Sequence, residues 1–133
     1  MKEGRMPGSL TNTAENLMLD WINGVGTPAR PTPPLKVALM TINGDDATNG
    51  TEVVGGSYAR QTLVVAAAVA GATSNSADLV WTGMPAVTVV GIEIWDSAAT
   101  PVRLWHEPLT ASRTVAAGDD FRLSAGALSQ SLS

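Results

Sequence analysis

The chain contains few of the residue types that carry enzymatic chemistry. It has no cysteine and one histidine, His106, which lies between Trp105 and Glu107. Nucleophilic catalysis needs an activated Ser, Thr or Lys and a base that a third group orients, and the sequence has no Gly-x-Ser-x-Gly elbow. We interpret His106 as a surface or edge residue of a strand. The sequence predicts a protein that is not an enzyme and needs no cofactor.

Three glutamates, Glu52, Glu93 and Glu107, raise the alternative of a small glycosidase. Such an enzyme needs two carboxyl groups that face each other across the substrate bond. Nothing in the spacing of these residues pairs any two of them. The glycosidase remains a weaker alternative to a non-enzymatic protein.

An acidic loop at residues 43–50 suggests calcium, because hard cations prefer several oxygen ligands from one tight loop. An EF-hand loop that begins at Asp45 places Ala47 at a ligand position and Gly56 where the bidentate glutamate belongs. Asn, Asp and Gly are common turn formers, so we predict a solvated turn here and another at residues 119–120. Without cysteine, and with one histidine, a transition-metal site is not expected either.

Four tryptophans are the remaining candidates for a binding site. Exposed aromatic residues often mark binding surfaces, and a row of them can stack on sugars. Burial is the simpler interpretation, because Trp21 lies on an apolar helix stripe and the others lie among Val, Ile and Leu. We predict that any interface involves one or more of Trp21, Tyr58, Arg60, Trp95 and Trp105.

Length and charge exclude several classes of function. The chain has 133 residues, a net charge of −4 and only 15% charged residues. It lacks the basic face that nucleic-acid binding needs. The apolar run at residues 63–70 is far shorter than the roughly 20 residues of a membrane span, and no signal peptide is recognisable. We expect neither nucleic acid nor membrane as a partner, and the low surface charge favours self-association.

One helix is expected near the N-terminus. Residues 1–11 show no periodicity and are predicted to form a flexible arm. A helix over about 13–24 follows, capped by Asn12 or Thr13 and ended by Gly24. Residues 26–34 contain four prolines and form a stiff linker. The helix stripe consists of Ala14, Leu17, Met18, Trp21, Ile22 and Val25, at helical spacing.

The chain from residue 35 to 133 alternates strand-like runs with turns. Residues 35–42 are apolar on both faces, as in a covered strand. The pattern is typical of an antiparallel β-sandwich or barrel of about eight strands with one N-terminal α-helix. We predict a single β-rich domain over residues 12–133. The strands are expected at 35–42, 57–65, 77–82, 87–95, 102–107, 113–116, 121–124 and 128–132.

Two glycines and two polar residues stand out in this part of the chain. Gly55 and Gly56 can supply a bulge or a positive φ before a strand. Tyr58 and Arg60 share a strand face, and Arg60 can bridge to a carboxylate on a neighbouring strand or subunit. We interpret each of these features as a contribution to the shape of the protein rather than to a catalytic reaction.

Three segments, in order, together resemble a family of small bacteriophage virion proteins described as tail-fibre-like, minor tail or head decoration proteins. They are the helix 14–24 with its linker and strand, the segment Gly50-Thr-Glu-Val-Val-Gly-Gly-Ser-Tyr-Ala-Arg-Gln-Thr62, and Val89-Val-Gly-Ile-Glu-Ile-Trp-Asp96 with the residues up to Leu128. Members commonly have threonine where this chain has Asp120, and residues 1–11 lie outside the pattern. The resemblance implies a virion protein made in the host cytoplasm, with no catalytic residues.

The resemblance leaves the place of the protein in the particle open. We expect a capsid decoration or cement protein that contacts the major capsid protein. The alternative is a small minor tail or fibre protein with a carbohydrate- or receptor-binding role. Its partners would be the major capsid protein or other virion proteins. We also expect homo-oligomers, with a trimer among the arrangements considered.

Overall fold

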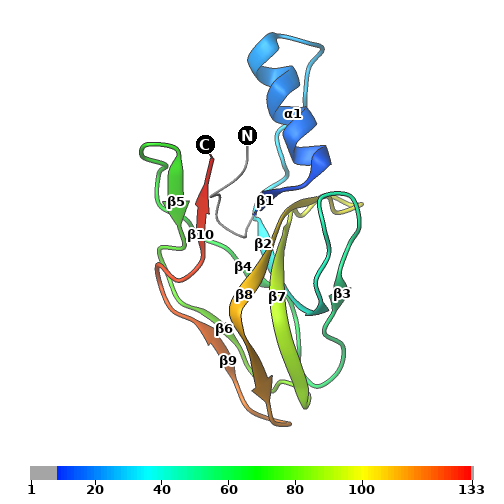
Figure 1. Ribbon diagram of the computed structural model, residues 1–133, viewed down its shortest axis with the longest axis vertical. Coiled ribbons are helices and arrows are strands. Elements are labelled where there is room, and N and C mark those ends of the chain that lie inside the picture. The colour runs from blue at the N-terminus through cyan, green and yellow to red at the C-terminus, as the bar shows by residue number, and fades with distance from the viewer. Residues whose placement is uncertain (1–8, 133) are drawn as a thin grey trace.

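The structure is a computed structural model that describes residues 9–132, and antiparallel strands form most of it (Figure 1). The helix is α1 (Asn12–Asn23). The strands are β1 (Ser9–Leu10), β2 (Lys36–Ile42), β3 (Thr51–Glu52), β4 (Gln61–Thr62), β5 (Ala72–Ser74), β6 (Leu79–Trp81), β7 (Val87–Trp95), β8 (Arg103–Val115), β9 (Phe121–Leu123) and β10 (Ser129–Ser131). The prediction of a mainly β, antiparallel fold with one helix near the N-terminus is confirmed.

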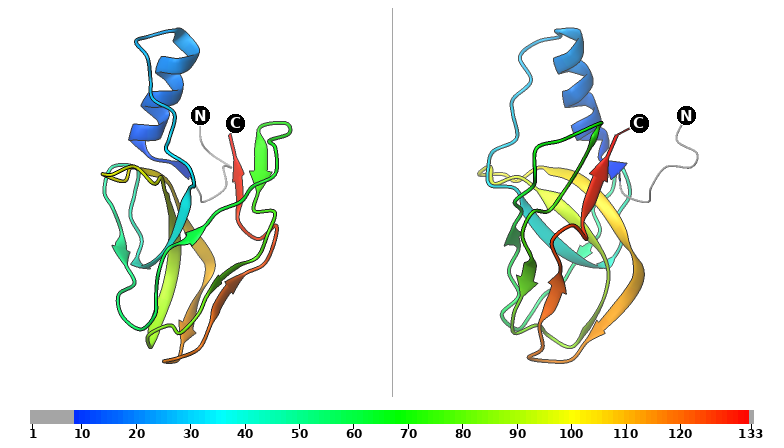
Figure 2. Two further views of the ribbon diagram at one scale, coloured as in Figure 1. Left: turned by 180° about the vertical axis from the view of Figure 1, so that it is seen from behind. Right: turned by 90° about the vertical axis from the view of Figure 1, so that its left-hand side faces the viewer.

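The central sheet has the strand order β1-β8-β7-β2-β3, and β4 also pairs with β2. Two further antiparallel pairs, β5 with β10 and β6 with β9, lie apart from this sheet and face it across the core (Figure 2). The core joins both parts. Trp81 of β6 and Phe121 of β9 meet edge to face, with their ring centroids 5.6 Å apart, and they belong to the same apolar cluster as Leu39 and Ile94 of the central sheet.

Strand β2 lies between β7 on one side and β3 and β4 on the other. Val37, Ala38, Leu39 and Met40 are all buried. A strand whose side chains are buried on both faces must be covered on both faces. The expectation that residues 35–42 form a covered strand is therefore confirmed.

Three of the expected strands differ from the structure. Over residues 57–65 only β4 is a strand, because Gly55 and Gly56 adopt φ values of 110° and 56° and the N–H of Tyr58 closes a turn on the carbonyl of Gly55. The positive φ predicted for the two glycines is confirmed. The strands expected at 102–107 and 113–116 are one strand, β8. The expected break at Pro108 is a register shift inside it.

Residues 9–11, which were expected to belong to a flexible arm, are part of the fold. Ser9–Leu10 pair with β8 as strand β1, and Thr11 rather than Asn12 or Thr13 caps the helix. Thr11 Oγ1 accepts the N–H of Ala14 at 3.2 Å and donates to the carbonyl of Arg103 at 2.8 Å. Residues 1–8 of the expected arm lie outside the described residues. Gly24 ends the helix in the left-handed conformation, as predicted.

Helix α1 projects from one end of the β-structure (Figures 1 and 2). Ala14, in the first turn, is its one buried residue. The chain then returns along the linker, which is fixed near its end: the N–H of Thr32 donates to Asp96 Oδ2 at 3.1 Å, and the N–H of Ser97 donates to the carbonyl of Thr32 at 2.9 Å. The helix and linker thus form a loop that is attached to the sheet at both ends.

Candidate functional site

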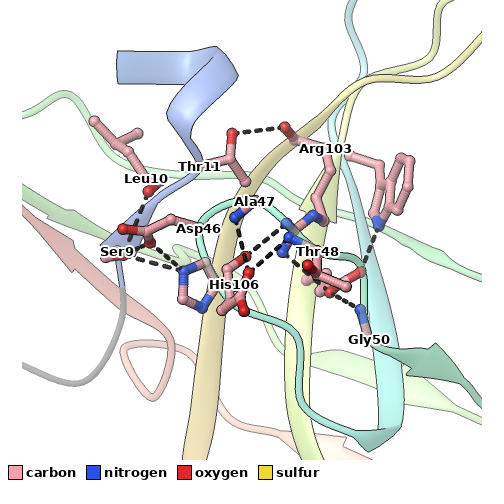
Figure 3. Close-up of polar contacts among 12 residues, drawn as sticks. Ser9, Leu10, Thr11, Asp46, Ala47, Thr48, Gly50, Arg103 and His106 are labelled. Carbon is pink, nitrogen blue, oxygen red and sulfur yellow. Dashed lines mark hydrogen bonds and ion pairs between the residues drawn. The ribbon is translucent and has the colours of Figure 1, made fainter. Parts of the chain in front are cut away.

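An internal ion pair holds the acidic loop 43–50 against the central sheet (Figure 3). Arg103 Nη1 lies 3.3 Å from Glu93 Oε2, and the two side chains are 5% and 1% exposed. Arg103 Nη2 donates to the carbonyl of Asp45 at 2.6 Å, and Glu93 Oε2 accepts the N–H of Gly50 at 2.8 Å. The two charged residues therefore fix both ends of the loop from inside the protein.

Ser9, Asp46 and His106 form a second set of contacts beside this ion pair (Figure 3). His106 Nε2 lies 2.7 Å from Asp46 Oδ1 and 3.1 Å from Ser9 Oγ, and Ser9 Oγ donates to Asp46 Oδ1 at 2.8 Å. In a hydrolytic triad the serine and the carboxylate contact different ring nitrogens, so that the ring can relay a proton. Here both contact Nε2, and Ser9 is buried. These three residues attach β1 and the loop to β8.

The loop that suggested calcium is closed by its own aspartate. Asp45 Oδ1 accepts the N–H groups of Thr48 at 2.6 Å and Ala47 at 2.9 Å. These bonds, that of Thr48 first, lower the pKa of Asp45. The turn interpretation is confirmed. Within residues 9–132, no three or more His, Cys, Asp or Glu side chains are grouped so that they could hold a metal ion.

Each of the three glutamates considered for glycosidase chemistry has its own hydrogen-bond donor. Glu93 is paired with Arg103, as described above. Glu107 Oε1 accepts Trp105 Nε1 at 3.2 Å, and burial raises the pKa of Glu107 against the lowering effect of this bond. Glu52 is held by Tyr58 and Arg60. Each of these carboxylates accepts hydrogen bonds from its own donors, and each stabilises a different part of the fold.

Tyr58 and Arg60 meet at Glu52. Tyr58 Oη donates to Glu52 Oε2 at 2.6 Å and accepts the N–H of Leu39 at 2.9 Å. Arg60 binds the same carboxylate through Nη2 at 2.8 Å and Nε at 3.0 Å, and its guanidinium lies 4.5 Å from the ring centroid of Trp95. The expected bridge from Arg60 to a carboxylate is confirmed, and this carboxylate belongs to Glu52 of the same chain.

The charges of this cluster are set by burial and hydrogen bonds. Burial alone would raise the pKa of Glu52, but the hydrogen bonds from Arg60 and Tyr58 outweigh it and the pKa is lowered. Burial, and then the bond to Glu52, raise the pKa of Tyr58 far above its usual range. At neutral pH the carboxyl group of Glu52 is therefore ionised, the phenol of Tyr58 is neutral and the guanidinium of Arg60 is charged.

The five predicted interface residues occupy three different environments. Tyr58, Arg60 and Trp95 form the half-buried cluster just described. Trp105 is buried in the core. Trp21 is 74% exposed on α1, so the expectation that the helix stripe is buried is wrong for this residue. Trp21 and Trp105 nevertheless line the same groove.

This groove lies between α1, the linker and the ends of the central sheet, and its volume is about 490 Å³. Leu17, Met18 and Trp21 of the helix line one wall, and Ile94 lies in its floor. The stripe that the sequence indicated as a packed face therefore borders open space. A 3.6-residue period shows that one face of a helix is apolar, but not what covers it.

The position of α1 and the charged residues inside the protein are the features that sequence reasoning missed. Arg103 follows a turn with no motif that marks it as an internal cation, and Asp46 and His106 lie far apart in the sequence. The four prolines of the linker were the available signal for α1, because a segment with fixed φ angles restricts how the helix can fold back on the sheet that follows.

The described residues therefore form strands and loops fixed by internal polar contacts, and an amphipathic helix projects from them. Residues 9–131 match the family described as Podophage GP4 fiber I protein gp80, and the chain belongs to this family. It is a bacteriophage virion structural protein, and the resemblance to small phage virion proteins is confirmed. No curated protein matches the chain. Over residues 9–132, α1 included, no helix has the length and apolar character to cross a membrane.

Proposed function

We propose that the protein is a structural component of a phage fibre rather than a capsid decoration protein. The observation that carries this proposal is the family match, which extends over residues 9–131 and is to a fibre protein. The structure fits a part with a fixed shape, because the ion pair of Glu93 and Arg103 and the cluster around Glu52 hold its loops to the strands. The exposed helix offers a contact to neighbouring proteins.

The proposal extends to partners and chemistry. The partners are other virion proteins and further copies of this chain. The protein acts without catalysis, since its histidine and the glutamates Glu52, Glu93 and Glu107 each take part in a contact that fixes the fold. Nucleic acid is not a partner, because the net charge of −4 is opposite to what phosphate binding needs.

Quantitative mass spectrometry of purified particles tests the proposal against capsid decoration. A fibre component is expected in a small number of copies per particle. A copy number equal to that of the major capsid protein, or to a simple fraction of it, would instead show a decoration protein spread over the shell. Absence from purified particles would rule out both. Gold-labelled antibody to the chain, viewed by electron microscopy, then locates it on the particle.

A receptor-binding role is the second candidate, and the exposure of Trp21 beside an open groove favours it. Tryptophan faces stack on sugars, and the other ring at the surface, Trp95, is covered on one face by Arg60. Quenching of tryptophan fluorescence by host polysaccharide in the native chain, and its loss in Trp21→Phe, would support this role. Equal quenching in both would count against Trp21 as the contact.

A further inference from the structure

The apolar face of α1 lacks the cover that a helix of this length needs. Trp21, Ile22 and Val25 are 74%, 64% and 56% exposed. A helix of 12 residues is only marginally stable in water, and most helices in proteins are stabilised by packing of their apolar face. Within the described chain, the first turn supplies the one buried helix residue, Ala14. The part of α1 beyond its first turn therefore presents a surface suited to packing against another molecule.

The hairpin of residues 63–77 lies at the same end of the protein as α1 (Figure 2), and it carries a second set of exposed apolar side chains. Residues 63–77 include no charged residue. They form a hairpin that turns at Ala70 and Gly71, where Val69 bridges to Ala72. Val69 is 75% exposed, and the N–H of Leu132 donates to the carbonyl of Gly71 at 2.8 Å, which brings the 48% exposed Leu132 to the tip. The strands of this hairpin and the helix project in the same direction (Figure 1).

Together these surfaces hold most of the exposed apolar area. Of the ten large apolar side chains that are exposed in residues 9–132, eight belong to these surfaces when Val25, just beyond the end of α1, is included: Leu19, Trp21, Ile22, Val25, Val64, Val65, Val69 and Leu132. With about 150–250 Å² for a whole Trp and about 60–120 Å² for a whole aliphatic side chain, their exposed parts amount to roughly 500 Å². A standard interface buries about 800 Å² on each partner, of which about 60% is apolar, again about 500 Å².

We propose that this end of the molecule binds a second copy of the chain. We call it the assembly end and define it as α1 with Val25 just beyond it, the groove beneath the helix, and the hairpin 63–77 with Leu132. The inference rests on the proposed role as a structural component of a fibre, which requires contacts between subunits. It adds the surface through which one such contact forms.

The charges of the assembly end suit contact with a copy of itself. Arg30 is the one charged residue in the lining of the groove, and it is exposed. Asp20, on α1, is exposed and has the opposite sign. Two copies that meet through this end can place a carboxylate of one near a guanidinium of the other, while the uncharged hairpin adds no repulsion. A self-complementary surface of this kind is what symmetric association requires.

Sedimentation velocity of the purified full chain over a range of concentrations tests the proposal. The native chain is expected to associate, and Trp21→Glu is expected to raise the dissociation constant at least about thirtyfold, as for a central tryptophan of an interface. Val54→Glu is the matched control, because Val54 is 85% exposed and follows β3, outside the assembly end. A monomeric native chain, or equal effects of the two substitutions, would overturn the proposal.

Val69→Glu tests the hairpin separately, and it is expected to weaken association while Val54→Glu does not. Because Trp21 and Val69 are exposed, both variants should keep the circular dichroism spectrum and melting temperature of the native monomer. A native chain that stays monomeric but is present in the fibre would refute self-association and leave the proposed function intact. Association of the purified chain, with the protein absent from particles, would refute the function alone.

Discussion

Glu93 and Arg103 form an ion pair between neighbouring strands, with Oε2 and Nη1 3.3 Å apart and side chains 1% and 5% exposed. Glu93 also accepts Trp95 Nε1 at 3.2 Å, through Oε1, and the N–H of Gly50 through Oε2. A buried ion pair stabilises a fold only when such bonds complete the partners of both charges. The loop 43–50 is therefore a surface turn that the ion pair ties to the central sheet.

The first prediction concerns this ion pair. Arg103→Met leaves the carboxylate of Glu93 buried without its cation, and we expect the free energy of unfolding to fall by about 3–5 kcal/mol. Urea denaturation measures the change. Arg122→Met is the control, because the pair of Arg122 with Asp78 is exposed and its loss should cost about 1 kcal/mol or less. Similar losses in both variants would show that the internal pair is dispensable.

The second prediction concerns Asn75, which is 1% exposed and links the start of the β6 segment to the C-terminal strand. Its Nδ2 donates to the carbonyls of Ala77 and Ser124, and its Oδ1 accepts the N–H of Leu128. Asn75→Ala leaves these backbone groups without partners, and we expect a loss of about 2–4 kcal/mol in urea denaturation. Asn23→Ala, at an exposed site, should change stability by less than about 1 kcal/mol.

The third prediction concerns the start of α1. Thr11→Val removes both the helix cap and the bond to the carbonyl of Arg103, and we expect a loss of about 1–2 kcal/mol in thermal or urea unfolding. Thr11→Ser should retain most of the stability, because serine offers the same hydroxyl. Thr13→Val is the matched control, because Thr13 is exposed and lies in the first turn of α1. If Thr13→Val costs as much as Thr11→Val, Thr11 is not the cap.

The fourth prediction concerns pH. The pKa of Glu52 is lower in the folded protein than its ordinary value of 4.5. A carboxyl with a lowered folded pKa binds its proton more weakly in the folded state, so its stabilising effect is present above pH 4.5 and is lost as the pH falls through the folded pKa. Glu52→Gln should therefore lower the melting temperature at pH 7 and have less effect near pH 3. A difference in melting temperature between the native chain and Glu52→Gln that does not change with pH would contradict this account.

The local pattern of apolar residues correctly predicted two long strands of the central sheet. Strands β2 and β7 lie within one residue of the expected limits, because runs of Val, Ile and Leu of this length favour only that structure. The contact of Arg60 with a carboxylate was also predicted from its shared face with Tyr58. These are short-range features of the sequence.

The features that depend on distant residues could not be predicted. Strand β1 is two residues long and exists because Ser9 pairs with His106 across most of the chain. The expected break at Pro108 failed because a proline can remain in a strand where the register shifts and its missing N–H is not needed. The exposure of Trp21 depends on where the helix lies relative to the sheet, and the periodicity of the helix does not carry this information.

The two attachments of the helix and linker have a consequence for binding. Thr11 fixes the start of α1 to the start of β8, and Asp96, which follows β7, fixes the linker to the end of that strand. The width of the groove between them is therefore determined by chain length and proline content before anything enters it. A preformed groove avoids most of the ordering cost of association. Insertions or deletions in the linker would then change which molecules fit, even where the residues of α1 and the sheet that line the groove stay the same.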